Sequence, residues 1–295
     1  RSVGQPLATW TAVTAVSTET STLAPSSAQV DRPRGVTGRG ASADGLADEP
    51  QLLARHLDGV PVVVGPRREQ TGRLACEQFG AQTLVLDDGF QHRRVARDCD
   101  IVLVSARMPL GGWACLPRGP MREPLGALSR ANVIILTKAD EALGVLSAWQ
   151  EQVRSYNPDA AVVTAVHTPA TLMDGATGRT EDLKHLEGLR VGLVSSIGDP
   201  QGFEATIQRL HAVVSWHRAY PDHHPYRARD WADLARRGSG TKPDAIVTTE
   251  KDWVRLQPVM GQGPLDVPLW VLGVHMTILN GEDALDARLA ALDAR

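Results

Sequence analysis

Residues 83–106 read TLVLDDGFQHRRVARDCDIVLVSA, in which two short apolar runs flank a polar turn. Apolar runs of this length, at 83–88 and 100–106, are typical of strands buried in a parallel sheet. Similar runs recur along the chain and alternate with stretches of helical periodicity. This alternation predicts an α/β fold with a mostly parallel, doubly wound sheet.

The expected elements form two series, separated by a polar stretch at 168–187 that we interpret as a linker. The first series has strands at 60–65, 83–88, 100–106 and 132–140 and helices at 44–57, 66–80 and 141–156. The second series has strands at 190–198, 212–220, 245–252 and 268–274 and helices at 199–211, 230–237 and 282–294. We therefore expect a larger domain at 44–185 and a smaller C-terminal α/β domain at 186–295.

Residues 1–43 differ from the rest of the chain. The Thr- and Ser-rich run at 11–30 has no helical or strand period, and Pro and Gly follow it. We expect this segment to be disordered or a loop. Because the chain starts at Arg1 rather than Met, we also expect that its start is a fragment or a processed end.

Composition excludes several classes of protein. The 295 residues include 34 acidic and 31 basic ones, a balance that argues against bulk electrostatic binding of nucleic acid. Three cysteines without CxxC spacing argue against a disulfide framework and a zinc site, and favour a reducing, cytoplasmic compartment. The longest apolar runs fall far short of the roughly 18 residues of a spanning helix.

Two polar clusters have the residue types of a phosphate site. Asp87 and Asp88 end a predicted strand, which is where a Walker B acid holds Mg²⁺ near a phosphate, and Gln91 and His92 follow on the same turn. The loop LPRGPMREPL (116–125) offers two guanidinium groups that bind phosphate well, beside a carboxylate that could pair with either or bind a metal. The alternatives are a solvated turn and an ordinary surface loop.

Two further clusters carry groups that can move protons or bind a nucleotide. In AYPDHHPY (219–226), His223 and His224 could be a general base pair, an orienting pair or metal ligands. The alternative is a polar loop with two solvated imidazoles. The strand IVTTEKD (246–252) ends in hydroxyls, an ammonium and carboxylates, for which the alternative is a strand-to-helix turn capped by Thr249.

Together these blocks resemble the tetraacyldisaccharide 4'-kinase family of lipid A biosynthesis. The matching blocks, in the family's order over residues 44–275, are DEPQLLARHL, VLDDGFQHRRVARDCDIVLV, LPRGPMREPLGAL, SSIGDPQGFEATIQRL, AYPDHHPY and IVTTEKDWVRL. The resemblance implies a P-loop-type α/β kinase with a smaller C-terminal α/β domain, which binds ATP and Mg²⁺ between its domains. The implied reaction transfers the γ-phosphate to the 4'-hydroxyl of a tetraacylated glucosamine disaccharide 1-phosphate, giving lipid IVA.

The resemblance also implies a role for individual residues. It makes Asp48 the catalytic base, with His223 or, alternatively, His224 as its partner. The remaining implied residues are Asp87 and Asp88 for the metal, Asp87, Asp88, Gln91, His92, Glu250 and Lys251 for the nucleotide, and Arg118, Arg122 and Glu123 for the substrate.

We further expect a glycolipid partner at a membrane surface, no nucleic acid and no protein partner. The implied location is cytoplasmic and peripheral on the inner membrane face, or an organelle if the source is a plant or alga.

The chain departs from the family at its N-terminal end. The pattern GxxxxGK[ST], whose backbone amides and lysine hold phosphates, occurs nowhere in it, and Ala47 replaces the Gly before Asp48. One hypothesis is that residues 5–40 come from out-of-frame translation or from an error in the gene model. The alternative function is a catalytically impaired homologue that binds lipid or protein.

Overall fold

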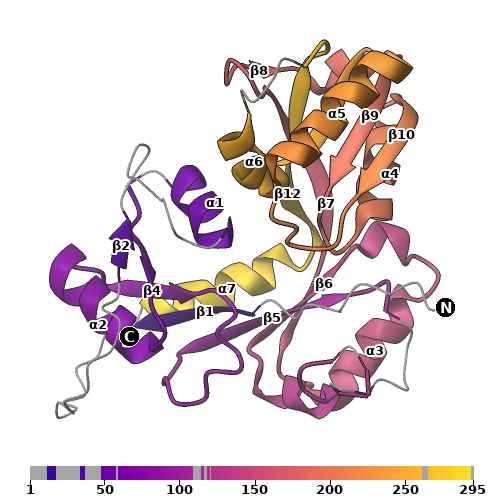
Figure 1. Ribbon diagram of the computed structural model, residues 1–295. Coiled ribbons are helices and arrows are strands. Elements are labelled where there is room, and N and C mark those ends of the chain that lie inside the picture. Colours follow the sequence, from indigo (N-terminus) through magenta and orange to yellow (C-terminus); the bar gives the residue numbers. More distant parts are fainter. Residues whose placement is uncertain are drawn as a thin grey trace. The chain divides into compact units, whose positions relative to one another are not determined.

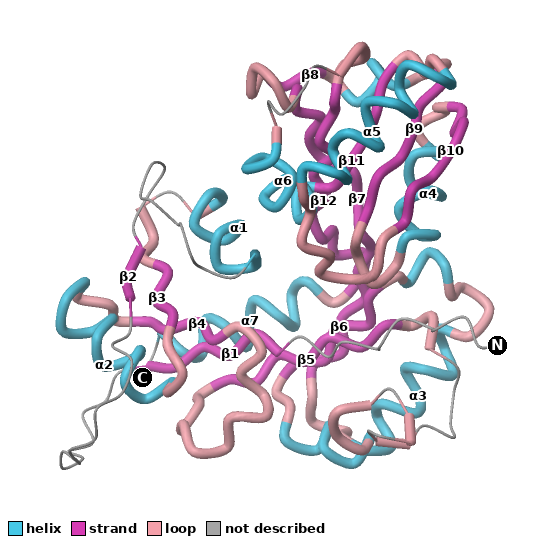
Figure 2. Tube along the Cα trace, viewed as in Figure 1, coloured by secondary structure: helices cyan, strands magenta, loops and turns pink. Residues whose placement is uncertain are grey.

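The computed structural model describes residues 12–17, 34–36, 48–57, 59–108, 114–115, 118–119, 121–260 and 265–293, with backbone only at 12–17, 34–36, 48 and 293. These residues form two compact units (Figures 1 and 2). The first unit contains 48–56 and 168–275, and the second contains 12–17, 34–36, 57–167 and 276–293. This division differs from the expected boundary at 185/186, because two long strands, β7 (Ala161–Asp174) and β12 (Leu269–Asn280), each run from one unit into the other.

The second unit is built on strands in the order β7-β6-β5-β1-β4. Their bounds are Val133–Thr137 for β6, Cys99–Ser105 for β5, Ala12–Ser17 for β1 and Thr83–Leu86 for β4. Strands β5, β6 and β7 are parallel, and every residue of β6 is buried, as a continuous apolar run predicts. The helices are α2 (Arg68–Phe79), α3 (Leu146–Tyr156), α7 (Glu282–Asp293) and two 3-10 helices, η1 (Leu125–Arg130) and η2 (Ala139–Glu141).

Two features of the second unit differ from the sequence prediction. The apolar run at 60–65 is not a buried parallel strand, because β3 (Val62–Val64) is only half-buried and pairs antiparallel with β2 (Arg34–Val36). Within the segment 1–43, expected to lack regular structure, β1 and β2 are strands, and β1 lies antiparallel between β4 and β5. The rest of that segment lies outside the described residues.

The first unit has the strand order β10-β9-β11-β12-β7, with its first three strand pairs parallel. Its other strands are β9 (Arg190–Ser195), β10 (Val213–Ala219), β11 (Ala245–Thr249) and β8 (Thr180–Glu181). Strand β8 pairs antiparallel with β7. The helices are α1 (Asp48–His56), α4 (Pro200–Arg209), α5 (Ala228–Thr241), α6 (Glu250–Leu256) and two 3-10 helices, η3 (Leu183–Leu186) and η4 (Gln257–Val259).

The segment 168–187 is therefore not the linker that its polar composition suggested. Most of its side chains are exposed or half-buried, but Leu172 in β7 and Leu186 in η3 are wholly buried in the core of the first unit. Burial of each leucine contributes about 1.5–3 kcal/mol to holding this stretch on the sheet, together with the pairing of β7 with β8. Among the described residues, none of the helices combines the length and the apolar character that crossing a bilayer requires.

Side-chain caps start α4 and α6, which follow β9 and β11 in the first unit. The Asp199 carboxylate accepts a hydrogen bond from the Gly202 amide at the start of α4, and Pro200 occupies its first turn. The Thr249 hydroxyl accepts from the Asp252 amide at the start of α6, which is the cap that the sequence offered as an alternative to a functional role. These caps end β9 and β11 in sharp turns, and the turns carry the polar residues described next.

Candidate active site

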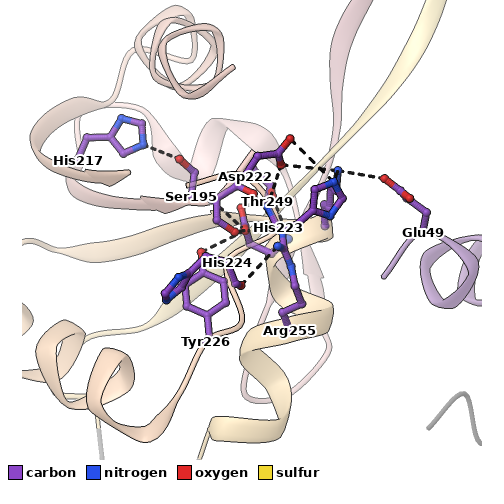
Figure 3. Close-up of polar contacts among 12 residues, drawn as sticks. Glu49, Ser195, His217, Asp222, His223, His224, Tyr226, Thr249 and Arg255 are labelled. Carbon is purple, nitrogen blue, oxygen red and sulfur yellow. Dashed lines mark hydrogen bonds and ion pairs between the residues drawn. The ribbon is translucent and has the colours of Figure 1, made fainter. Parts of the chain in front are cut away.

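Three parallel strands of the first unit end close to one another and carry polar turns. Strand β9 ends at Ser195, β10 ends at Ala219 before the loop at 220–226, and β11 ends at Thr249 before α6. Because the carboxyl ends of parallel strands meet at one edge of a sheet, such turns are the usual place for a ligand site in an open α/β fold. Figure 3 shows the polar side chains gathered at this edge.

His223 lies in the loop after β10 with its side chain about half exposed. Its backbone has φ +56°, a left-handed conformation that is uncommon outside glycine. Its amide donates to the Ser196 carbonyl at 3.2 Å and to the Asp222 carboxylate at 3.0 Å. The Nε2 atom of the ring is 3.5 Å from Lys251 Nζ and 3.9 Å from Asp222 Oδ2. The imidazole thus faces both an ammonium and a carboxylate.

His224 has a different environment, although it is the next residue. Its ring stacks on Tyr220 with centroids 4.5 Å apart, and its Nε2 lies 3.1 Å from Asp230 Oδ2. The same Asp230 oxygen accepts the Arg227 amide at the start of α5, so His224 is tied to the beginning of that helix. With 18% of its side chain exposed, against 52% for His223, His224 belongs to the packing. The sequence left the two histidines as alternatives, and the geometry favours His223.

Lys251 connects this loop to α1. Its Nζ atom is 3.1 Å from Glu49 Oε1 in α1 and 4.0 Å from Asp222 Oδ1. Two more contacts join α1 to the segment after β11, since His56 Nε2 lies 3.3 Å from Glu250 Oε2 and Arg55 donates to Gln257 at 2.7 Å. Glu250 and Lys251, expected to bind nucleotide, thus have α1 side chains as partners.

Asp48, the expected catalytic base, is the first residue of α1, and its side chain lies outside the described residues. Its neighbour Glu49, which the sequence analysis did not single out, is the residue that contacts Lys251. Figure 3 shows the Glu49 carboxylate directed toward Asp222 and His223. The start of α1 therefore lies beside the histidine loop.

Gly273 in β12 allows Glu250 to lie against the sheet. A Cβ atom at this position would collide with the Thr171 hydroxyl and lie 2.9 Å from the Glu250 carboxyl carbon. We expect Gly273→Ala to lower the free energy of unfolding by about 1–3 kcal/mol, as overpacking does, measured by urea denaturation. The control is Gly240→Ala in α5, where the added Cβ meets nothing within 4 Å. An equal loss of stability in both variants would contradict the steric explanation.

The second unit holds the other set of expected residues, at the turn after β4. Asp88 has φ +54°, and its carboxylate pairs with Arg122 at 2.5 Å. The side chains that line a small hollow here are Asp88, Phe90, Gln91, Arg122, Glu123, Pro124, Ala127 and Leu128. The blocks around Asp88 and Arg122 are thus brought together, as one phosphate site requires. The exposed side chains of Asp87, His92 and Arg118 are not part of this lining.

Glu123 is engaged by arginines that the sequence analysis had not selected. Its carboxylate lies 3.0 Å from Arg93 Nη2 and 2.9 Å from Arg130 Nη2. The Arg130 guanidinium also lies over the Phe90 ring, 4.2 Å from its centroid. Glu123 therefore ties the loop after β4 to η1, while Arg122 pairs with Asp88 and its side chain is one-third exposed.

Ser195, His217 and Glu204 form a chain of contacts that the sequence analysis missed. The Ser195 hydroxyl lies 2.8 Å from His217 Nε2 (Figure 3). On the other side of the ring, His217 Nδ1 lies 2.9 Å from Glu204 Oε2. This connectivity matches that of a hydrolase triad. Because Ser195 is wholly buried, its hydroxyl is not accessible to a substrate. The contacts instead link β9 and β10 to α4.

Comparison with known proteins decides which family has these features. The family model of tetraacyldisaccharide-1-P 4'-kinase matches residues 27–293. The chain belongs to this family. A tetraacyldisaccharide 4'-kinase of Anaeromyxobacter dehalogenans strain 2CP-C is 44% identical over 246 residues, which are 82% of this chain and 64% of that protein. One from Syntrophus aciditrophicus is 39% identical over 238 residues, 78% of this chain and 63% of that protein.

A solved structure has the same fold as this 4'-kinase family member. It is LpxK from Aquifex aeolicus in complex with ATP, which superimposes with a TM-score of 0.63 at 24% identity and covers 88% of this chain and 74% of that one. The chain spans about 64% of the length of the curated relatives it matches. The family resemblance seen in the sequence and the expected α/β class with a mostly parallel sheet are both confirmed.

Proposed function

We propose that the protein carrying this chain transfers the γ-phosphate of ATP to the 4'-hydroxyl of a tetraacylated glucosamine disaccharide 1-phosphate, giving lipid IVA. Membership of the 4'-kinase family supports this activity. The observation that carries the proposal is the arrangement of His223, whose ring faces Asp222 and Lys251 beside the start of α1. The family resemblance of the sequence motifs implies a catalytic base at this position.

The chemistry needs a group that accepts the proton of the attacking hydroxyl. A sugar hydroxyl is a weak nucleophile, and a positioned acid–base residue contributes about 10²- to 10⁴-fold. We assign the proton acceptor to Asp48 and its partner to His223. The contacts from Glu49 to Lys251 and from Lys251 to His223, at 3.1 and 3.5 Å, support this pairing because Glu49 directly follows Asp48.

We assign the phosphate and metal side to the turn after β4. Among the described residues there is no group of three or more His, Cys, Asp or Glu that could hold a metal ion alone. Mg²⁺ in kinases is commonly held by one or two carboxylates together with substrate phosphates, so Asp87 and Asp88 fit it. When bound, Mg²⁺ would neutralise charge on the transferred phosphoryl group. Arg122 and Gln91 would contact the phosphates from the lining of the same hollow.

The proposed acceptor also suggests where the protein acts. A disaccharide with four acyl chains resides in a membrane, so the enzyme must reach it at the bilayer surface. We propose a peripheral position on the cytoplasmic face of the inner membrane. The near balance of 34 acidic and 31 basic residues gives no reason to expect a nucleic acid partner.

The test is transfer of label from γ-labelled ATP to the purified acceptor lipid in mixed micelles. Labelled lipid with phosphate on the 4'-oxygen is the expected product. Because the 295 residues contain no GxxxxGK[ST] pattern, binding of ATP and of the acceptor is measured separately by calorimetry. Acceptor binding without any transfer would contradict the kinase assignment and favour a lipid-binding role.

A further inference from the structure

Asp252, in the first turn of α6, is wholly buried and accepts five hydrogen bonds. A buried carboxylate is tolerated only where hydrogen bonds and an opposite charge replace its hydration. The donors are the Ser196 amide at 2.9 Å, the Ser196 hydroxyl at 2.5 Å, the Tyr226 hydroxyl at 3.1 Å, the Thr249 hydroxyl at 2.7 Å and Arg255 Nη2 at 3.0 Å. These five hydrogen bonds hold the carboxylate at a fixed position.

These donors lie in the turn after β9, at the end of β11, in α6 and at the end of the histidine loop. Burial, and secondly the charge of Asp252, raise the pKa of the Tyr226 phenol above its ordinary value, so the phenol keeps its proton and can donate. Arg255 reaches the same loop directly, because its Nη2 donates to the Ser196 carbonyl at 3.2 Å and its Nη1 to the His224 carbonyl at 3.5 Å. Asp252 therefore joins three segments that are distant in sequence.

Asp252 is linked to His223 through Ser196, which forms hydrogen bonds with both residues. Asp252 fixes Ser196 by both its amide and its hydroxyl, and the Ser196 carbonyl then accepts the His223 amide at 3.2 Å. His223 has φ +56°, a sparsely populated conformation that persists only where its surroundings determine it. The loop on the other side of His223 is held by Tyr226, whose hydroxyl returns to Asp252.

We propose that Asp252 is a positioning residue of the phosphotransfer site, which holds His223 in its left-handed conformation through Ser196 and Tyr226. The proposal rests on the proposed function, because that function makes His223 a partner of the base. In the described contacts, the Asp252 side chain touches neither Asp222 nor Lys251. Its proposed effect on the site is therefore indirect. A loosened loop would leave the imidazole present but incorrectly oriented.

The experiment compares Tyr226→Phe and Asp252→Asn with Tyr220→Phe in the whole chain. Tyr220 lies in the same loop and stacks on His224, but its hydroxyl makes none of the hydrogen bonds to Asp252. We expect Tyr226→Phe to lower kcat at least tenfold with both KM values within twofold, and Asp252→Asn to lower it further. Hydrogen exchange of the amides of residues 222–224 and 226 should accelerate at least tenfold in both variants. Tyr220→Phe should leave both quantities within twofold of the parent protein.

The outcomes separate this proposal from a merely stabilising role. If Tyr226→Phe lowers the melting temperature while kcat per folded molecule and exchange at 222–226 stay unchanged, the positioning role is wrong. Tyr226→Phe keeps the ring and so remains informative if Asp252→Asn does not fold. Hydrogen exchange needs no kinase activity, so a parent protein without transfer would refute the proposed function, whereas unchanged exchange would refute the positioning of His223.

Discussion

Replacing His223 by asparagine should lower kcat about 100- to 10,000-fold, the contribution typical of a positioned acid–base group. Asparagine is the suitable substitute because it tolerates the left-handed conformation that His223 adopts at φ +56°. The loss should therefore come from the missing imidazole rather than from a rearranged loop. Steady-state kinetics with ATP and the acceptor lipid measures it, and both KM values should stay within a few-fold.

His224→Asn is the matched control, since it makes the same change at the adjacent residue. His224 stacks on Tyr220 and contacts Asp230, so its loss should lower the free energy of unfolding by about 1–3 kcal/mol. The kcat of the folded protein should change only a few-fold. A larger loss of kcat in His224→Asn than in His223→Asn would reverse the assignment of the two histidines.

Local patterns in the sequence predicted the strands that are buried on both faces. Strand β6 is a continuous apolar run, and all of its residues are buried. The same criterion did not predict β7. Its last residues, up to Asp174, are mostly exposed or half-buried and include one buried leucine, Leu172. A strand whose side chains are mostly exposed or half-buried has a weak apolar signal, so its polar residues resemble a linker.

Contacts between residues distant in sequence were harder to predict than the motifs themselves. The sequence kept His224 as an alternative to His223, because their environments depend on Tyr220, Asp230 and Lys251 rather than on spacing. The contact between Arg55 and Gln257 joins residues 202 positions apart, and no local pattern predicts it. Asp252 belongs to the motif IVTTEKD (246–252). The residue pattern of this motif does not distinguish a buried carboxylate from a solvated one.

The turn after β4 gives the second large expected effect. Asp88→Asn should lower kcat roughly 100- to 1,000-fold at a fixed Mg²⁺ concentration, because metal stabilisation of the transferred charge supplies several kcal/mol and each 1.36 kcal/mol is tenfold in rate. The substitution suits this position, since asparagine accepts φ +54° and its amide oxygen can still accept from Arg122. What is lost is the negative charge that would bind the metal.

The dependence of kcat on Mg²⁺ concentration separates this role from a structural one. If Asp88 binds the metal, saturation of the Asp88→Asn variant should need a several-fold higher Mg²⁺ concentration. Asp159→Asn makes the same chemical change at an exposed site of the same unit and should leave the curve unchanged. If Asp88 acts only through its ion pair with Arg122, the variant should instead lose a little stability and keep the parent Mg²⁺ dependence, since a partly exposed pair contributes about 0–1 kcal/mol. An unchanged Mg²⁺ requirement would therefore remove Asp88 from the metal site and leave it as the anchor of Arg122.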